Sequence, residues 1–524
     1  MLLQLKNILF HSKPIIMKPT KLILALCCLT VFSAKAQRTI SAVIVDSTKQ
    51  EPIPFATILI DNKTGVISND KGEFNITINR KISNTDSLFI SCLGYEQKQF
   101  AIQNFRDSII PLRTKNIDLS EVFITNKNYT IDEILDKVKE SLEANYDFGF
   151  AKRKLFYRES YYTKMLKTDV KIEESTIPEF NQAFVDSIIR SVPKNTDQHT
   201  EVLGEIYGKL KPSTPQKMDI LKASRLYDKE SEITFENYEK RFNEIIRKHV
   251  KRNSYFKIKS GWFGTKEEID SSFFVDKKEE KETAEFIEKK KELEAKRKAN
   301  FLNWRKGSIH NLENANFLNE DSDLNFIEKS RRYEFEMQDF AYFNNEFVYT
   351  ISFKPKRSED FEGTLYINTQ DFAIVRVDYK NVKPLRKFGL LGISLNEYLK
   401  EGTIIFQKNT NNKYTLKYVD ETNGQQVGIK RPLKIIEKNK HVKGRRKQNE
   451  LAADLHFIVR NIEKKELIVF ESTPILENEF NNFNEVPEVT PTYLPAYDPE
   501  FWKGYNIIEP NQAIKDFKII EKTH

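Results

Sequence analysis

The sequence predicts an α+β protein, mostly β, in which a small antiparallel β-sandwich precedes a large curved antiparallel sheet with flanking helices. Short runs of alternating apolar and polar residues recur along the chain, with turn residues between them. The chain also holds 38 Phe and 21 Tyr against 17 Gly and 18 Pro. An aromatic excess of this kind favours strands that pack around filled interiors.

The first segment, residues 1–36, has the features of an export signal, with Met17 as a second candidate start. Lysines precede the apolar run 22–32, and the small-residue cleavage site 34–36 follows it. The apolar run is too short to span a membrane. We therefore expect an exported chain with no transmembrane helix in its mature form.

Charge and cysteine content narrow the possible partners. The net charge is +8, but five lysines and no acidic residue lie in the first 36 residues, so cleavage would lower it to +3. A nearly neutral exported chain is not expected to bind nucleic acid. Cys27 and Cys28 would leave with the signal, which leaves Cys92 without a disulfide partner. A lipid anchor on Cys27 is a weaker alternative, because Leu26 precedes it.

The segment 37–124 is predicted to be the β-sandwich. In one hairpin, Asp70 is expected to cap the turn, Gly72 to adopt positive φ, and Phe74 to point into the core. The strand-like runs are 39–46, 55–60, 66–69, 73–78, 87–92, 98–102 and 108–112.

This segment resembles the carboxypeptidase-regulatory-like β-sandwich. The resemblance rests on Glu-Pro-x-Pro at 51–54, on the Asp-x-Gly-x-Phe hairpin at 70–74, and on Leu-Gly-Tyr at 93–95. It implies an exported accessory module of envelope proteins and no chemistry of its own. Asp70, Gly72, Phe74, Gly94 and Tyr95 are thus structural markers of the family.

The segment 125–330 is predicted to mix helices and strands. Thr130 and Glu133 form a capping box that starts a helix over 130–145. A second helix is expected over 234–251, and strands over 154–167 and 254–263. The charged stretch 276–300 lacks a sustained heptad repeat, so we expect a solvated helical excursion and not a coiled coil.

The segment 331–524 is predicted to be an antiparallel β-rich domain. Its hairpin 361–379 resembles that of lipoprotein-carrier-like half-barrels, and a half-barrel lined by Phe, Tyr and Ile would suit an acyl chain. Near its end, the aromatic segment 497–505 is expected to dock on the sheet; its aromatic residues are Tyr497, Phe501, Trp502 and Tyr505.

Catalytic patterns are weak. His310-x-x-Glu313 with a distant His441 or His456 matches the zinc-ligand spacing of metallocarboxypeptidases, but such a tetrapeptide arises easily by chance in a chain with 76 acidic residues. The sequence contains neither Gly-x-Ser-x-Gly nor a phosphate loop. We therefore predict no catalytic residue, no metal ligand and no cofactor.

A basic run at 434–447 has two interpretations: a solvated loop between strands, or a contact for anionic lipid headgroups. The candidate contact residues are Lys438, Lys440, Lys443, Arg445, Arg446 and Lys447.

Together these features favour an exported, non-enzymatic protein of the cell envelope with a binding or scaffolding role. We expect it in the periplasm or at the outer membrane, with a lipid or an outer-membrane protein as partner. The alternatives are a hydrolase associated with a regulatory sandwich, and a pure protein–protein interaction module.

Overall fold

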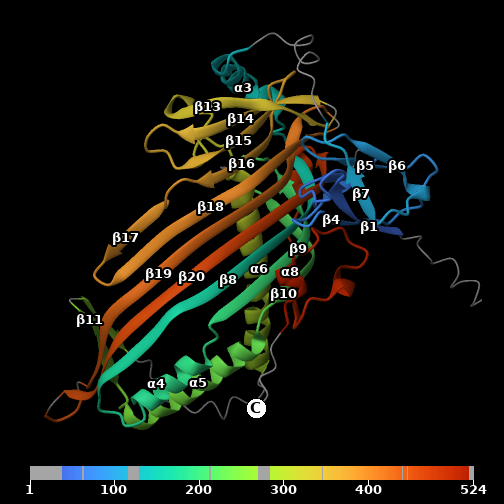
Figure 1. The fold of residues 1–524 in the computed structure, drawn as a ribbon. Helices are drawn as coiled ribbons and strands as arrows, with labels where there is room; N and C mark the ends of the chain where they lie inside the picture. The colour runs from blue at the N-terminus through green and yellow to red at the C-terminus, as the bar shows by residue number, and fades with distance from the viewer. Residues whose placement is uncertain are drawn as a thin grey trace, which may run out of the picture.

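The computed structural model describes residues 38–518, except 62–63, 116–128, 212–213, 262, 269–283, 345, 410, 440 and 445. The predicted fold class, α+β and mostly β, is confirmed. Two small sheets form the sandwich, and one 14-stranded sheet dominates the rest of the described chain (Figure 1). The expected signal segment 1–36 lies outside the described residues.

The sandwich consists of a three-stranded and a four-stranded sheet. In sheet order, the first holds β4 (Glu73–Ile78), β1 (Arg38–Asp46) and β7 (Ile109–Leu112). The second holds β3 (Thr64–Ile67), β2 (Thr57–Ile60), β5 (Ser87–Ser91) and β6 (Lys98–Ala101). Phe74, Ile76 and Ile78 are buried between the sheets, as their alternation predicts.

The turn before β4 differs from expectation in one contact. Asn69, and not the exposed Asp70, caps it: its Oδ1 accepts hydrogen bonds from the backbone N–H of Lys71 at 3.0 Å and of Glu73 at 2.9 Å. Gly72 has φ of 70°, as predicted. A Cβ at this position would lie 2.4 Å from the carbonyl oxygen of Ile44, so only glycine fits.

The large sheet joins strands from both sides of residue 330. Its order is β13-β14-β15-β16-β18-β19-β20-β8-β9-β10-β21, with β11, β12 and β17 paired at its side. The bounds are β8 Ala151–Ser175, β9 Asn195–Gly208, β10 Lys217–Leu226, β11 Ser254–Ser260, β12 Phe263–Glu268, β13 Tyr333–Phe343, β14 Glu346–Pro355, β15 Phe361–Asn368, β16 Ile374–Asn381, β17 Arg386–Leu390, β18 Ile393–Lys408, β19 Tyr414–Asn439, β20 Lys447–Pro474 and β21 Thr492–Leu494.

The helices are α3 Ile131–Asn145, α4 Gln182–Ser191, α5 Lys229–His249, α6 Ala284–Asn314, α7 Glu477–Asn482 and α8 Gln512–Lys515, with 3₁₀ turns at Ile102–Asn104, Ser330–Arg332 and Pro499–Trp502. Thr130 and Glu133 form the predicted capping box of α3. The charged stretch falls partly on α6, which is exposed over 291–297. Among the described residues, no helix is long and apolar enough to cross a membrane.

Different layers cover the two faces of the sheet. On one face, the hydroxyl of Tyr157 in β8 donates to Ser308 of α6 at 3.1 Å. On the other face, the ring of Phe156 meets Trp502 of the C-terminal segment edge-on at 5.4 Å. Successive residues of a strand point to opposite faces, so α6 and the C-terminal segment enclose the sheet between them. Figure 1 shows α4 and α5 crossing the far end of the long strands, away from the sandwich.

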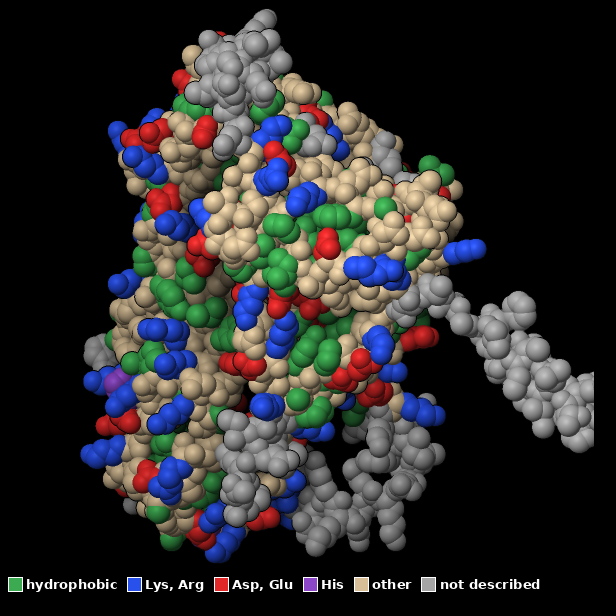
Figure 2. Space-filling model, turned by 45° about the vertical axis from the view of Figure 1, so that its right-hand side comes forward, with side chains coloured by type: hydrophobic (Ala, Val, Ile, Leu, Met, Phe, Trp, Pro, Cys, Tyr) green, Lys and Arg blue, Asp and Glu red, His purple; other side chains and the backbone are tan. Residues whose placement is uncertain are grey.

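Hydrogen bonds and an ion pair attach the sandwich to the large sheet and the C-terminal segment. The backbone N–H of Thr77 donates to Asn506 Oδ1 at 2.7 Å, and Lys515 pairs with Glu73 at 2.6 Å. The backbone N–H of Gly94, one of the family markers, donates to the carbonyl of Tyr342 in β13 at 2.9 Å. In the space-filling view the sandwich stands against the sheet, along which Lys and Arg alternate with hydrophobic side chains (Figure 2).

Candidate functional site

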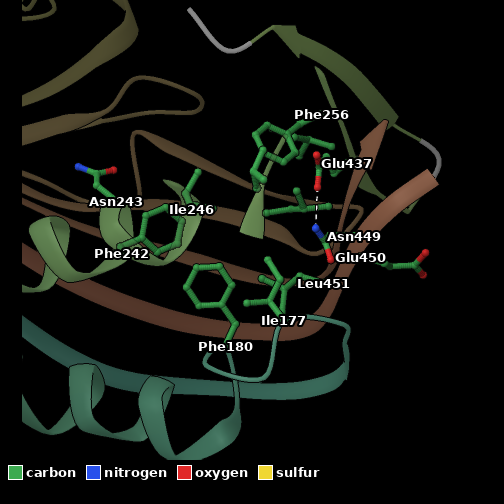
Figure 3. A pocket seen from close by; sticks show the side chains of 13 residues that line it. Ile177, Phe180, Phe242, Asn243, Ile246, Phe256, Glu437, Asn449, Glu450 and Leu451 are labelled. Carbon is green, nitrogen blue, oxygen red and sulfur yellow. Dashed lines mark hydrogen bonds between the residues drawn. The ribbon is translucent and has the colours of Figure 1, made fainter. Parts of the chain in front are cut away.

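An apolar cavity of about 300 Å³ lies at the far end of the long strands, beneath α5 (Figure 3). Its walls come from the loop before α4, from α5, from β11, and from the ends of β19 and β20. The lining residues are Ile177, Phe180, Phe242, Asn243, Ile246, Val250, Phe256, Ile258, Ile435, Glu437, Asn449, Glu450 and Leu451.

Local sequence explains how these walls form. Tyr238 lies seven and eight residues before Ile245 and Ile246 on α5, which is about two helical turns, so the three share the face that turns toward the sheet. With Phe184 of α4 and Ile177 they belong to a small hydrophobic cluster separate from the main core. The cavity therefore sits inside a local core of its own, which the rest of the fold does not fill.

Phe242 marks the mouth of the cavity. Its ring stacks on Phe180 at 5.0 Å, and 43% of the side chain is exposed. Figure 3 shows the two rings next to each other, with Phe242 on α5 and Phe180 on the loop before α4.

Apart from Asn243 of α5, the polar lining residues lie on the floor, and the two floor carboxylates have partners within the protein. Glu437 is buried; its carboxylate accepts hydrogen bonds from the backbone N–H of Lys251 at 3.0 Å and from Asn449 Nδ2 at 2.7 Å. Glu450 pairs with Lys434 and Lys447. Since no floor carboxylate needs a partner from outside, the cavity presents apolar surface to whatever enters.

A polar latch holds α5 beside the segment that precedes α4. The Glu179 carboxylate lies 2.6 Å from Lys248 Nζ and 2.7 Å from His249 Nε2. The hydrogen bond from Lys248, together with the close approach of His249, lowers the pKa of Glu179 to about 2. The hydroxyl of Tyr238 also donates to the carbonyl of Ser187 at 3.0 Å. Helix α5, which forms the roof of the cavity, is thus joined to the α4 region by Lys248 and His249 at its C-terminal end and by Tyr238 further back.

The predicted acyl site at 361–379 is not where the cavity lies. Phe361, Leu365 and Tyr379 of β15 and β16 are buried in the main core, and Phe361 meets Tyr379 edge-on at 5.8 Å. The apolar residues of this hairpin therefore fill the core, and the open volume beside the hairpin is a polar cleft that Gly363, Asp378 and Tyr379 help to line.

The basic run occupies the tip of the β19–β20 hairpin. Lys443 and Arg446 are exposed there, while Lys438 is half-buried in β19 and Lys447 pairs with Glu450. Lys440 and Arg445 lie outside the described residues. A contact of this tip with anionic headgroups stays a prediction.

The structure does not bring the metallocarboxypeptidase-like residues together. The Glu313 carboxylate is buried and lies 3.0 Å from Arg153 Nε in β8. His456 of β20 pairs with Asp169 of β8, roughly 50 Å further along that strand at about 3.3 Å per residue. Within the described residues, no group of three or more His, Cys, Asp and Glu side chains could hold a metal ion.

A buried charge cluster, which sequence reasoning missed, lies in the middle of the sheet. Arg158 is buried, at 2.7 Å from Glu201 and 3.4 Å from Glu466, and its NH2 donates to the carbonyl of Ile508. Burial raises the pKa of Asp420, which pairs with Lys464 at 3.2 Å. These residues are far apart in the sequence and meet only because β8, β9, β19 and β20 pair, so no local pattern could reveal them.

Asp420 and Lys464 also line a polar cleft of about 510 Å³ between the sheet and Phe55 of the sandwich. Removal of one partner from such a buried cluster would leave an uncompensated charge and would destabilise the fold.

Three solved structures show weak likeness. A domain described as an outer membrane lipoprotein-sorting protein from Vibrio parahaemolyticus is 10% identical, covering 66% of this chain and 95% of its own, with a TM-score of 0.18. MucB in complex with MucA(peri) is 5% identical, with coverages of 64% and 94% and a TM-score of 0.13. The Pseudomonas aeruginosa MucA/MucB complex is 4% identical, with coverages of 62% and 93% and a TM-score of 0.13. TM-scores of this size do not establish a shared fold.

No curated protein sequence matches the chain. A family model does match its beginning: the model of the CarboxypepD_reg-like domain covers residues 40–124. This range contains the turn with Gly72 and the Gly94–Tyr95 pair described above. The N-terminal sandwich therefore belongs to the CarboxypepD_reg-like domain family.

Proposed function

We propose that this chain is an exported, non-enzymatic binding protein of the cell envelope that holds an apolar ligand, such as an acyl chain, beneath α5. The observation that carries the proposal is the cavity of about 300 Å³, which is lined mostly by Ile, Leu, Val and Phe side chains. Volumes of this order are typical of small-molecule sites.

The chemistry of the walls selects the ligand class. The carboxylates of Glu437 and Glu450 are already bonded within the protein, so a polar ligand would gain no partner there. An apolar chain would instead bury its own surface and the surface of the cavity walls. Each Å² of apolar surface removed from water would contribute about 25 cal/mol of favourable binding free energy. The floor would be left undisturbed.

The location of the protein in the cell envelope is part of the proposal. It is supported by the signal-like segment 1–36 and by the CarboxypepD_reg-like domain, which the resemblance associates with exported proteins. We place the protein in the periplasm or at the outer membrane. Its partner would be a lipid or an outer-membrane protein.

The test begins with native protein. The full chain, expressed with its signal and purified without detergent, is extracted with organic solvent and examined by mass spectrometry. We expect a co-purified lipid. After delipidation we expect saturable binding of the fluorescent fatty acid cis-parinaric acid. Absence of both a co-purified lipid and probe binding would refute the proposal.

Matched tryptophan variants locate the site. Ile246→Trp fills the cavity from α5 and should weaken probe binding at least tenfold. Ile462→Trp makes the same change on a half-buried residue of β20 outside the cavity lining and should leave binding unchanged. Equal binding by both variants would exclude this cavity as the site.

A further inference from the structure

Exposed hydrophobic side chains gather on one edge of the large sheet, where β17 and β18 form a hairpin beside β19. Leu390 is 69% exposed, and Leu391 and Phe263 are each 59% exposed. We call the whole group the apolar edge; it consists of Phe263, Phe388, Leu390, Leu391, Ile393 and Ile429.

Strand register places most of this edge on one face. Ile393 of β18 pairs with Leu390 and with Ile429, and Ile429 pairs in turn with Phe457 of β20. Cross-strand partners point to the same side of a sheet.

The same face leads to the cavity. β19 continues without a register shift from Ile429 to Ile435, three steps of two residues further along, and Ile435 pairs with the cavity residue Leu451. The apolar edge and the apolar cavity therefore open on one face of the sheet.

The turn of this hairpin is unusual for its sequence. Leu391 and Gly392 connect β17 to β18 with φ of 51° and 80°. Such a two-residue turn favours Asn or Asp at its first position, because a larger side chain is strained at positive φ. Leu391 adopts this strained backbone conformation, yet its side chain gains little packing in return, because most of it is exposed. Neither turn geometry nor core packing accounts for a leucine here.

The three chain segments that carry the apolar edge contain basic residues and no acidic ones. Segments 257–266, 383–393 and 428–434 each carry three Lys or Arg residues and no Asp or Glu. Lys266, Lys383, Arg386 and Lys434 pair with carboxylates outside these segments. The others in these segments are Lys257, Lys259, Lys387, Lys430 and Arg431. No ion pair joins them to a carboxylate within the described part of the chain, and Arg431 donates hydrogen bonds to Ser260.

We propose that the apolar edge docks on the surface of an anionic lipid bilayer. Leu390, Leu391, Phe388 and Phe263 would enter the interface, and the neighbouring cations would contact lipid phosphates. Exposed apolar side chains bordered by Lys and Arg fit such a surface better than they fit water. A protein partner would have to supply acidic groups around an apolar groove. Docking does not depend on whether the cavity holds a ligand.

The test is co-sedimentation of the full chain with vesicles. We expect binding to vesicles of equal parts phosphatidylglycerol and phosphatidylcholine, weakened by 0.5 M salt because charge contributes, and little binding to pure phosphatidylcholine. The double variant Leu390→Ser/Leu391→Asn should lower the partition coefficient at least tenfold. Since Asn tolerates positive φ, Leu391→Asn alone should keep or raise the Tm while it weakens binding.

Two further variants complete the design. Leu476→Asn makes the same change on a 65% exposed leucine before α7 and should bind like the wild type. Lys443→Ser/Arg446→Ser removes exposed cations of the β19–β20 tip and should weaken binding less than the double variant. The proposal is overturned if the wild type does not bind anionic vesicles, if the apolar-edge variants bind normally, or if only the tip variants lose binding. cis-Parinaric acid binding, measured separately, shows whether the cavity works independently of docking.

Discussion

Trp502 donates its indole N–H to Glu201 at 2.6 Å, and this bond fastens the C-terminal segment to the middle of the sheet. Glu201 is fully buried and also accepts hydrogen bonds from Arg158 and Ser224. Trp502 is itself buried against Phe156. A buried carboxylate with several donors is stable only while each donor stays in place.

The first prediction concerns this bond. Trp502→Phe keeps an aromatic ring but removes the N–H, so the free energy of unfolding should fall by about 1–3 kcal/mol. Urea denaturation followed by circular dichroism measures the change. Trp304→Phe, at a tryptophan that is 73% exposed, should change stability by less than about 0.5 kcal/mol. Similar losses in the two variants would contradict the role given to the Glu201 bond.

The second prediction separates two glycines of the sandwich that both have positive φ. Gly72→Ala would place a Cβ 2.4 Å from the carbonyl oxygen of Ile44 and would add backbone strain. Gly94→Ala adds strain only, because nothing lies within 4 Å of its Cβ position. We expect Gly94→Ala to cost roughly 1–2 kcal/mol and Gly72→Ala distinctly more. Thermal melts of the two variants provide the comparison, and equal Tm values would show that the close contact is relieved.

The third prediction concerns pH and the latch at Glu179. Its pKa is lowered from 4.5 to about 2 by its hydrogen bonds with Lys248 and His249. A depressed carboxyl pKa gives stability that is present above the unfolded value and is lost as pH falls from about 4.5 to 2. We expect amide exchange in α5 to accelerate over this window. Glu179→Gln should show fast exchange already at pH 6, with less change on acidification; a wild-type response in that variant would exclude the latch.

The fourth prediction concerns the buried His199. Burial lowers its pKa from 6.5 to about 4, and the nearby Arg158 acts in the same direction. Because the unfolded state binds the proton more tightly, stability should fall as pH drops from about 6.5 to 4. NMR titration should find one imidazole that stays neutral down to about pH 4 and that disappears in His199→Gln. An ordinary pKa near 6.5 for this ring would mean that water reaches it.

The sandwich could be predicted in detail because its information is local. Each strand is short and ends at a turn residue, and the core positions alternate, as at Phe74, Ile76 and Ile78. The one misassigned contact, Asp70 in place of Asn69, exchanges neighbours of similar chemistry in the same turn. The capping box at Thr130 could also be predicted, because both of its residues lie within one short stretch of sequence.

The long strands could not be read in this way. The stretch 422–426, Thr-Asn-Gly-Gln-Gln, has loop-like residues, yet it lies inside β19, which runs unbroken for 26 residues. Its backbone is held by pairing with β18 on one side and β20 on the other. Tertiary hydrogen bonding overrides local preference here.

The cavity was hidden for a related reason. Ile177, Phe256 and Leu451 look like ordinary core residues in their own segments, and nothing in the sequence indicates that α5 will leave space between them. The apolar edge was equally invisible, because exposure of Leu390 and Leu391 depends on where the sheet ends. Both features arise only when segments that are distant in the sequence come together in the folded chain.

Contacts between the sandwich and the C-terminal segment join positions 425 to 442 residues apart in the sequence, as in Asn79 with Gly504 and Glu73 with Lys515. This separation bears on the order of folding events. Closing so large a loop is slow, so we expect the sandwich to take its place only after the large sheet has formed. We therefore expect assembly to include a docking step, in which the sandwich meets a C-terminal segment that Trp502 and Glu201 hold on the sheet.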